Sequence, residues 1–402
     1  MLFRSATRRQ ARLLLAHLGN DPHHFDPCFH IPRVAVCAGQ LSEHPGPVPL
    51  QSPPSLAVEV CQAMRAWLQQ VDAGIGYASA AGGAGIMFLE AMLELGGEIN
   101  VVLPCPEAEA RKARVDRFLG AEWGKHFDQV LKRAANVYTV SKYDSPERAV
   151  ADAYANLFLE GMATLRAQML DTELEVVDVA ELLANTSVEL APGTASSPMP
   201  LEAALPSPFP QQIRAMLFAD AVGYSKLTEG QIPLFGLHFL QPVANLAARS
   251  PDELLEKNTW GDALYFVFAS VTAAGRFALD LRDLFQEVEW TKMGLPENLG
   301  IRIALHAGPV YSRIEPVTER PDYCGSHVSL ASRIEPITPP DHVYASQAFV
   351  ALAAAQGVTD FTCDYVGRVP LAKGYGTFPM YHVRRRHLVK ALGDKMKADP
   401  QA

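Results

Sequence analysis

The sequence predicts a two-domain α/β protein of 402 residues. Two observations support this prediction: the first half alternates strand and helix patterns, and the chain is longer than one core of ordinary size needs. The segment TSVELAPGTASSPMPLEAALPSPFP at 186–210 has linker composition, because prolines without periodicity favour an extended spacer. We therefore expect an N-terminal segment at 1–30, domains at 31–185 and 211–385, and a polar tail at 386–402.

Composition and charge argue against several classes of partner. A net charge of −9 does not suit a surface that coats nucleic acid, which needs clustered Lys and Arg. Six scattered cysteines without a C-x-x-C pair fit reduced thiols in a cytoplasm. The longest apolar patch, 264–275, is shorter than the roughly 20 residues of a membrane span. The Arg-rich start at 1–20 lacks a secretory signal, and it favours a solvated helix over contact with a membrane surface. We expect a cytoplasmic protein without a membrane span or a nucleic-acid partner.

In the first half, apolar patterns typical of strands alternate with patterns typical of helices. Strands are expected at 32–39, 75–81, 98–104 and 136–141, and helices at 55–71, 84–95, around 127–134 and within 147–170. Strands that alternate with helices predict a parallel sheet with helices on both faces, which is a Rossmann-like arrangement.

A glycine turn, AGGAG, closes a predicted strand and opens a helix. Open parallel sheets bind ligands at this place, and Gly82, Gly83 and Gly85 would let backbone N–H groups face a phosphate. Glu90 and Glu94 share one face of the helix that follows, because they are four residues apart. Such glycines also serve tight turns and such acids a solvent edge. The sequence therefore leaves two interpretations open: a ligand site with Gly82, Gly83, Gly85 and Glu90, or a structural turn.

The glycine turn and the following INVVLPCP resemble the Rossmann-like family of DNA-processing protein A and the "lonely guy" phosphoribohydrolases, over about 32–145. Members of that group bind or process nucleotides and related small molecules. No catalytic motif of the group is complete in this sequence. The resemblance therefore implies a domain that senses a small-molecule effector, without an activity of its own.

Two aspartates in the second half each lie at one end of an apolar stretch. Asp220 follows the apolar stretch MLFA, and Asp262 lies in a Trp-Gly-Asp turn before the apolar run ALYFVF. A hairpin would bring both carboxylates to one sheet edge, where paired acids repel unless cations lie between them. Mg²⁺ or Mn²⁺ suits carboxylate oxygens and implies a phosphate-bearing substrate. Either aspartate alone would more simply cap a turn.

Cationic groups follow later in the chain. Ser329 and Arg333 are four residues apart in a predicted helix, so both lie on one face. An arginine in such a place suits a phosphoryl group that gains charge in a transition state. Lys373 beside Gly374 offers a point charge for terminal phosphates.

These segments, in this order and spacing, resemble the class III adenylate and guanylate cyclase catalytic domain over 211–385. The resemblance implies an α+β, ferredoxin-like fold and two divalent ions, Mg²⁺ or Mn²⁺, at Asp220 and Asp262 with Ala221 beside them. It implies catalytic roles for Arg333 and Ser329. The residues that it assigns to the nucleoside triphosphate are Val222, Gly223, Tyr224, Ser225, Asn258, Asp322 and Lys373.

In that family the active site forms across a head-to-tail dimer. The metal aspartates come from one chain, and Asp322, Ser329 and Arg333 come from the other. This sequence contains both sets. The resemblance therefore implies a homodimer with two identical sites that produce a 3′,5′-cyclic nucleotide and pyrophosphate.

Several positions depart from the family pattern. Ser329 replaces an asparagine that orients the ribose, and His327 is a candidate to compensate for it. Asn258 stands where adenylate cyclases have Lys and guanylate cyclases Glu, and its neutral amide selects no base. Asp322 accepts hydrogen bonds, which favours an exocyclic amino group such as that of adenine. ATP is therefore the expected substrate. A pyrimidine cyclase of bacterial antiviral signalling and an inactive nucleotide-binding module remain alternatives.

Overall fold

The computed structural model describes residues 1–37, 54–182 and 209–386, apart from residues 118, 146, 178, 180, 181, 251, 252 and 287. Residues 186–208 of the expected linker and residues 387–402 of the expected tail lie outside the described residues. The chain forms two compact units. The first comprises Met1–Arg214, Ala307–Val328 and Ala348–Gln356, and the second comprises Ala215–His306, Ser329–Gln347 and Gly357–Ala402.

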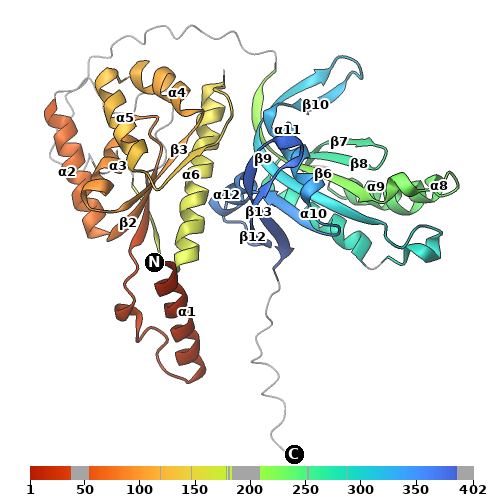
Figure 1. Ribbon diagram of the computed structural model, residues 1–402, viewed down its shortest axis with the longest axis horizontal. Helices are drawn as coiled ribbons and strands as arrows, with labels where there is room; N and C mark the ends of the chain where they lie inside the picture. The colour runs from red at the N-terminus through yellow and green to blue at the C-terminus, as the bar shows by residue number, and fades with distance from the viewer. Residues whose placement is uncertain are drawn as a thin grey trace, which may run out of the picture. The chain divides into compact units, whose positions relative to one another are not determined.

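A five-stranded parallel sheet lies in the first unit (Figure 1). Its strand order is β4-β3-β2-β1-β5. The strands are β1 (Arg33–Cys37), β2 (Ala73–Ala78), β3 (Glu98–Leu103), β4 (Asn136–Thr139) and β5 (Leu174–Val176). The four strands predicted from the sequence are confirmed. Strand β5 was not predicted, because three residues are too few to show a period of two.

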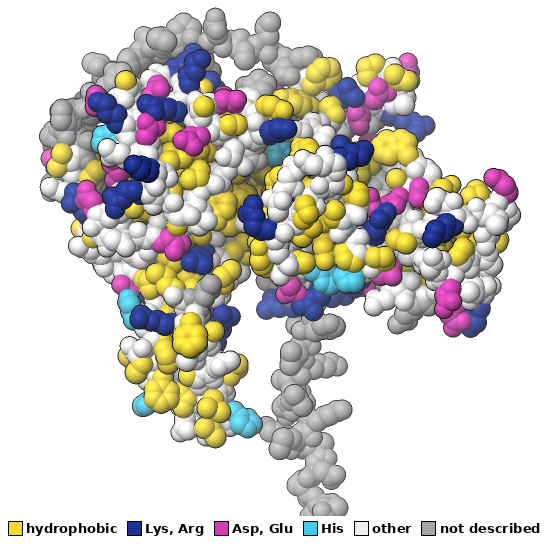
Figure 2. Space-filling model, in the orientation of Figure 1, with side chains coloured by type: hydrophobic (Ala, Val, Ile, Leu, Met, Phe, Trp, Pro, Cys, Tyr) yellow, Lys and Arg dark blue, Asp and Glu magenta, His cyan; other side chains and the backbone are white. Residues whose placement is uncertain are grey.

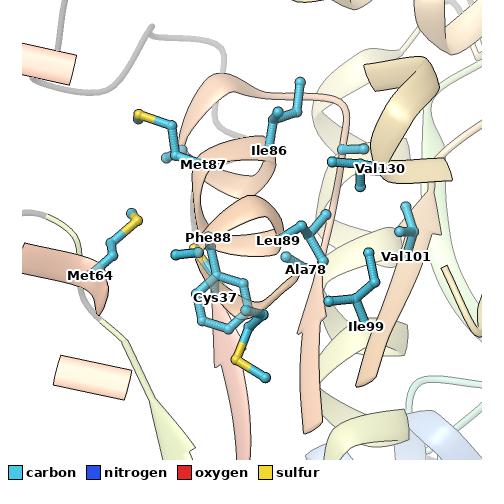
Figure 3. Packing of buried hydrophobic residues seen from close by; sticks show 14 of the residues in the cluster. Cys37, Met64, Ala78, Ile86, Met87, Phe88, Leu89, Ile99, Val101 and Val130 are labelled. Carbon is cyan, nitrogen blue, oxygen red and sulfur yellow. The ribbon is translucent and has the colours of Figure 1, made fainter. Parts of the chain in front are cut away.

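Helices cover both faces of this sheet. They are α2 (Pro54–Gln70), α3 (Gly83–Glu94), α4 (Glu107–Ala110), α5 (Ala121–Arg133) and α6 (Arg148–Leu170). Side chains of α2, α3 and α5 form one apolar core with the strands, and Figure 3 shows Leu89 of α3 beside Ala78 and Ile99. Helix α6 packs on β1, β2 and β3 from the other face. The prediction of a parallel sheet between helices is confirmed.

Helix α1 (Leu2–His17) is attached to the C-terminal end of α6 through arginines. Arg8 donates to the carbonyl oxygen of Asp171, which follows α6. Arg12 donates to the carboxylate of Asp171 at 2.5 Å and to that of Asp26 at 2.9 Å. Cations stabilise the negative end of a helix dipole. The expectation of a solvated helix is therefore wrong for Arg8 and Arg12.

The other face of α1 exposes apolar side chains, which gather on its surface in Figure 2. Phe3 is 84% exposed and Leu13 is 72% exposed, with Leu14 and Leu18 nearly as accessible. In the described part of the chain no residue covers them.

Helix α6 also contacts those parts of the C-terminal half that belong to the first unit. Tyr154 Oη donates to the carbonyl oxygen of Ala307 at 3.1 Å, and the Tyr154 ring meets the His327 ring edge-on at 5.2 Å. Gly161 lies against the backbone of Ala351, where an added Cβ would be 1.9 Å from the carbonyl oxygen. This close approach requires a glycine at 161.

The C-terminal half contains an eight-stranded sheet in the order β12-β13-β11-β9-β6-β8-β7, with β10 paired to β9. The strands are β6 (Gln211–Val222), β7 (Leu254–Trp260), β8 (Ala263–Phe268), β9 (Gly300–Glu315), β10 (Arg320–Cys324), β11 (Val343–Ser346), β12 (Phe361–Pro370) and β13 (Thr377–Arg385). The helices are α8 (Ile232–Phe235), α9 (Gln241–Ala248), α10 (Val271–Gln286), α11 (Ser326–Ile334) and α12 (Gln347–Ala355). Within the described residues, no helix is both long and apolar enough to cross a membrane.

Candidate active site

Asp220 and Asp262 lie close together where the antiparallel strands β6 and β8 meet at one edge of the sheet. In the antiparallel register of β6 and β8, Asp220 is opposite Ala263, the residue after Asp262. Burial raises the pKa of the Asp262 carboxyl, and the negative charge of Asp220 raises it further. The strand pairing expected from the sequence is confirmed, and it brings the two carboxylates together as predicted. The hairpin that contains Asp262 in its turn joins β7 to β8.

Two glycine turns shape the backbone around this pair. Gly223 has φ +89° and Gly261 has φ +67°, in the left-handed region that favours glycine. The turns meet, because a Cβ on Gly261 would lie 3.8 Å from the Tyr224 ring. The Tyr224 ring in turn packs 4.8 Å from that of Phe235. The backbone from Gly223 to Ser225 is thereby held beside the turn that contains Asp262.

Arg302 and Glu335, which sequence analysis did not identify, join the two aspartates. Arg302 Nη2 donates to Asp220 Oδ2 at 2.6 Å. Arg302 Nε lies 2.9 Å from Glu335 Oε1, which is an ion-pair distance, although the angles are not those of a hydrogen bond. Burial raises the pKa of Glu335 to about 7, and the charges of Asp220 and Asp262 act in the same direction. The sequence signal for this cluster was a charged residue, Arg302, within the otherwise apolar stretch IRIALH. The structure shows that Arg302 is half-buried.

The donor set at this edge fits a divalent cation that is shared with a phosphate. Asp220 and Asp262 supply two carboxylates, which repel each other unless a cation lies between them. Among the described residues, no group of three or more His, Cys, Asp and Glu side chains is arranged to hold a metal ion. Mg²⁺ is commonly bound by one or two carboxylates together with substrate phosphates. The arrangement therefore suits a substrate-linked ion better than a structural one.

Helix α11 presents the predicted Ser329 and Arg333. Ser329 is exposed and Arg333 is partly buried. Arg333 Nε is buried and has no hydrogen-bond partner among the described residues, where Arg333 also forms no ion pair. A buried donor without a partner is costly. Arg333 therefore has unused capacity to bind an anion.

A small apolar cluster joins the elements that contain the predicted residues. Leu330 and Ile334 of α11 pack with Phe218 of β6 and with Leu371. Phe218 is two residues before Asp220, and Leu371 is two residues before Lys373. Lys373 itself is exposed and has φ +59°. One core therefore sets the positions of the strand with Asp220, the helix with Arg333 and the turn with Lys373.

The two predicted base contacts have different neighbours. Asn258 Oδ1 accepts the backbone N–H of Thr259 at 2.8 Å, which leaves the amide NH₂ as a donor. Asp322 on β10 accepts from Arg313 Nε at 3.1 Å. Arg313 is a third residue that sequence analysis missed, after Arg302 and Glu335.

His327 does not compensate for the short side chain of Ser329. It is only 6% exposed, and its ring packs against Tyr154. Burial lowers the pKa of His327 to about 4, so that the ring is neutral at pH 7. The structure therefore makes His327 part of the packing of the first unit.

The glycine turn of the first unit has clear packing functions. A Cβ on Gly85 would lie 1.9 Å from the carbonyl oxygen of Ser79, so that only glycine allows this helix to start so close to the strand. Glu90 Oε1 lies 2.6 Å from His126 Nδ1. Glu90 is also about 10 Å along the helix axis from the start of α3. These contacts explain Gly85 and Glu90 without a ligand, and the ligand site at this turn stays a prediction.

Comparison with known proteins supports the assignment of the C-terminal half. Residues 210–385 match the family model described as "Adenylate and Guanylate cyclase catalytic domain". No match was found among curated proteins. The comparisons give no support to the family resemblance of the N-terminal half.

Solved cyclase structures are similar to less than half of the chain. The adenylyl cyclase CyaB from P. aeruginosa is 19% identical, with a TM-score of 0.39 over 45% of this chain and 97% of that one. The guanylate cyclase domain of RhGC from Catenaria anguillulae, in complex with GTP, is 21% identical, with a TM-score of 0.37 over 44% and 99%. A monomeric adenylate cyclase from Trypanosoma brucei is 19% identical, with a TM-score of 0.37 over 43% and 88%.

The family match covers every predicted residue of the site, from Asp220 to Lys373. The C-terminal half of the chain, residues 210–385, therefore matches the adenylate and guanylate cyclase catalytic domain.

Proposed function

We propose that the protein is a nucleotide cyclase that converts ATP to its 3′,5′-cyclic nucleotide and pyrophosphate. The observation that supports this most strongly is the pairing of Asp220 and Asp262 at one sheet edge of a cyclase catalytic domain.

In this reaction the ribose 3′-oxygen attacks the α-phosphorus and loses its proton. A new oxygen–phosphorus bond forms, and the bond from the α-phosphorus to the bridging oxygen breaks with its electron pair on pyrophosphate. Asp220 and Asp262, with the backbone of Ala221, would hold two Mg²⁺ or Mn²⁺ ions. Such ions, when bound, acidify a hydroxyl and neutralise phosphate charge. Arg333 stabilises the charge on the α-phosphate, and Lys373 binds the leaving pyrophosphate.

The remaining residues orient the substrate. The backbone from Val222 to Ser225 binds the β- and γ-phosphates, because the left-handed Gly223 leaves room for them. Ser329 contacts the ribose through one hydroxyl. Asn258 and Asp322 face the base, with the amide NH₂ of Asn258 as a donor. A head-to-tail homodimer completes each site with Asp322, Ser329 and Arg333 of the second chain.

The N-terminal domain, residues 31–185, regulates the cyclase in this proposal. Helix α6 contacts His327 through Tyr154, and His327 lies in the first turn of α11. Arg333 lies near the end of the same helix. A small-molecule effector bound near Gly82 and Gly83 would thereby shift the position of Arg333 through α6 and α11.

A pyrimidine cyclase and an inactive nucleotide-binding module are the competing functions. Incubation of the full chain with Mn²⁺ and each of ATP, GTP, CTP and UTP tests them, with cyclic product and pyrophosphate as the readout. We expect product from ATP and a loss of at least about 100-fold in Asp262→Asn. Asp364→Asn, which alters an exposed ion pair with Arg384, serves as the matched control. Nucleotide binding without product from any of the four would show that the protein is a binding module.

A further inference from the structure

A cross-strand ion pair places a cation directly at the predicted base contact. Asp322 of β10 is opposite Arg313 of β9 in the antiparallel register, so both side chains lie on one face of the ribbon. Arg313 Nε and Nη2 both lie 3.1 Å from Asp322 Oδ2. The geometry therefore makes Arg313 and Asp322 one recognition unit.

This pair has unused hydrogen-bonding groups on both partners. Among the described residues, no hydrogen bond uses Asp322 Oδ1 or Arg313 Nη1. The two side chains are 25% and 34% exposed, so that a ligand can reach them. Arg313 cannot lose its proton in a protein, so it is a constant hydrogen-bond donor beside the Asp322 carboxyl group. The pair thus offers a donor next to an acceptor.

A donor beside an acceptor matches the edge of a nucleobase. Adenine and cytosine have an exocyclic amino donor next to an acceptor ring nitrogen, whereas guanine and uracil have a carbonyl acceptor next to a ring N–H. With the carboxylate of Asp322 on the group at C6 of a purine or C4 of a pyrimidine, the amino group of adenine or cytosine satisfies both partners, whereas the carbonyl of guanine or uracil would face the carboxylate. Arg313 then donates to the ring nitrogen.

We propose that Arg313 is a specificity-determining residue that, with Asp322, selects a nucleotide with an amino base. This inference rests on the proposed function, in which Asp322 faces the base. It also explains how a site with the neutral Asn258 discriminates among bases, because the charged donor is supplied by β9. An ordinary surface pair of Arg and Asp would contribute little to stability and nothing to base selection.

The test compares base selectivity in the full chain. We would measure kcat/KM for ATP, CTP, GTP and UTP in the unaltered protein, Arg313→Met, Arg313→Lys and the control Arg384→Met. Arg384 also pairs with an aspartate across two antiparallel strands. We expect Arg313→Met to lower the preference for amino over keto bases roughly tenfold to hundredfold, mainly through KM. Arg313→Lys should show an intermediate loss, and Arg384→Met none.

Equilibrium binding of the same four nucleotides in Ca²⁺ separates this inference from the proposed function. If no cyclic product forms but Arg313→Met removes a binding preference for amino bases, the cyclase activity is refuted and the role of Arg313 is supported. Three results would overturn the inference: equal losses for all four nucleotides in Arg313→Met, a preference of the unaltered protein for GTP or UTP, or no base preference in either measurement.

Discussion

At the scale of single residues, charge compensation dominates the sheet edge that contains Asp220 and Asp262. Three carboxylates, those of Asp220, Asp262 and Glu335, lie near the guanidinium of Arg302. Like charges at this distance raise one another's pKa, and the guanidinium opposes that effect. Arg302 therefore holds Asp220 in place while leaving Asp262 with a raised pKa.

The buried His327 should make the protein less stable in acid. Its pKa is lowered from 6.5 to about 4 by burial, so between these values the unfolded chain binds a proton that the folded chain does not. The contribution is fully present above pH 6.5 and is lost as the pH falls through 4. The loss approaches about 3 kcal/mol.

Urea denaturation between pH 4 and pH 7 measures this effect. His327→Gln should flatten the dependence of the free energy of unfolding on pH, and His17→Gln, at an exposed position, should leave it unchanged. Equal pH dependence in the His327 variant and the unaltered protein would contradict the prediction.

At the scale of elements, helix α6 packs on the parallel sheet and helix α11 contains Arg333. Helix α6 covers one face of the parallel sheet and contacts Ala307, His327 and Ala351 within the first unit. Helix α11 begins beside His327 and ends with Arg333 and Ile334. Its apolar side packs against the strand that leads to Asp220. Helix α11 therefore positions Arg333, whereas Lys373 lies in a turn.

Gly161→Ala should destabilise the first unit. A methyl group there would lie 1.9 Å from the Ala351 carbonyl oxygen, so α6 and α12 have to separate. We expect a cost of roughly 1–3 kcal/mol. Gly236→Ala is the matched control, because its added Cβ meets nothing within 4 Å and its backbone is helical.

Chemical denaturation of both glycine variants measures the two effects. The control should be stabilised by about 0.5–1 kcal/mol, since alanine favours a helix over glycine. Equal changes in the two variants would show that Gly161 is not closely packed.

At the scale of the whole molecule, the proposed homodimer determines how two inactivating substitutions, one in each chain, affect the two active sites of a dimer. A head-to-tail dimer takes Asp262 from one chain and Arg333 from the other for each site. Two different inactive variants in one dimer therefore leave one site fully defective and the other intact.

A mixture of Asp262→Asn and Arg333→Ala tests this arrangement. Each variant alone should lose at least about 100-fold in activity. After the chains exchange, random pairing should restore about a quarter of the unaltered activity, because half of the dimers have one intact site. Dimers that exchange chains without recovering activity would show that each site is built from a single chain.

The sequence predicted those features that depend on residues close together in the chain. Alternating strand and helix periods predicted four strands of the parallel sheet and the helices on both of its faces, because burial of one face imposes a period on neighbouring residues. Motif spacing identified the cyclase domain and the pair of Asp220 and Asp262. It did not identify Arg302, which bonds to a residue 82 positions away.

By itself, then, the sequence determined the two-domain α/β layout and the resemblance of residues 211–385 to a cyclase catalytic domain. Only the tertiary structure decided that Arg302 and Glu335 join the aspartates, that Arg313 pairs with Asp322, and that His327 is packed against α6. The physical reason is that these partners meet through packing of distant segments. Local periodicity encodes which side chains are buried, but not which buried or charged groups come together.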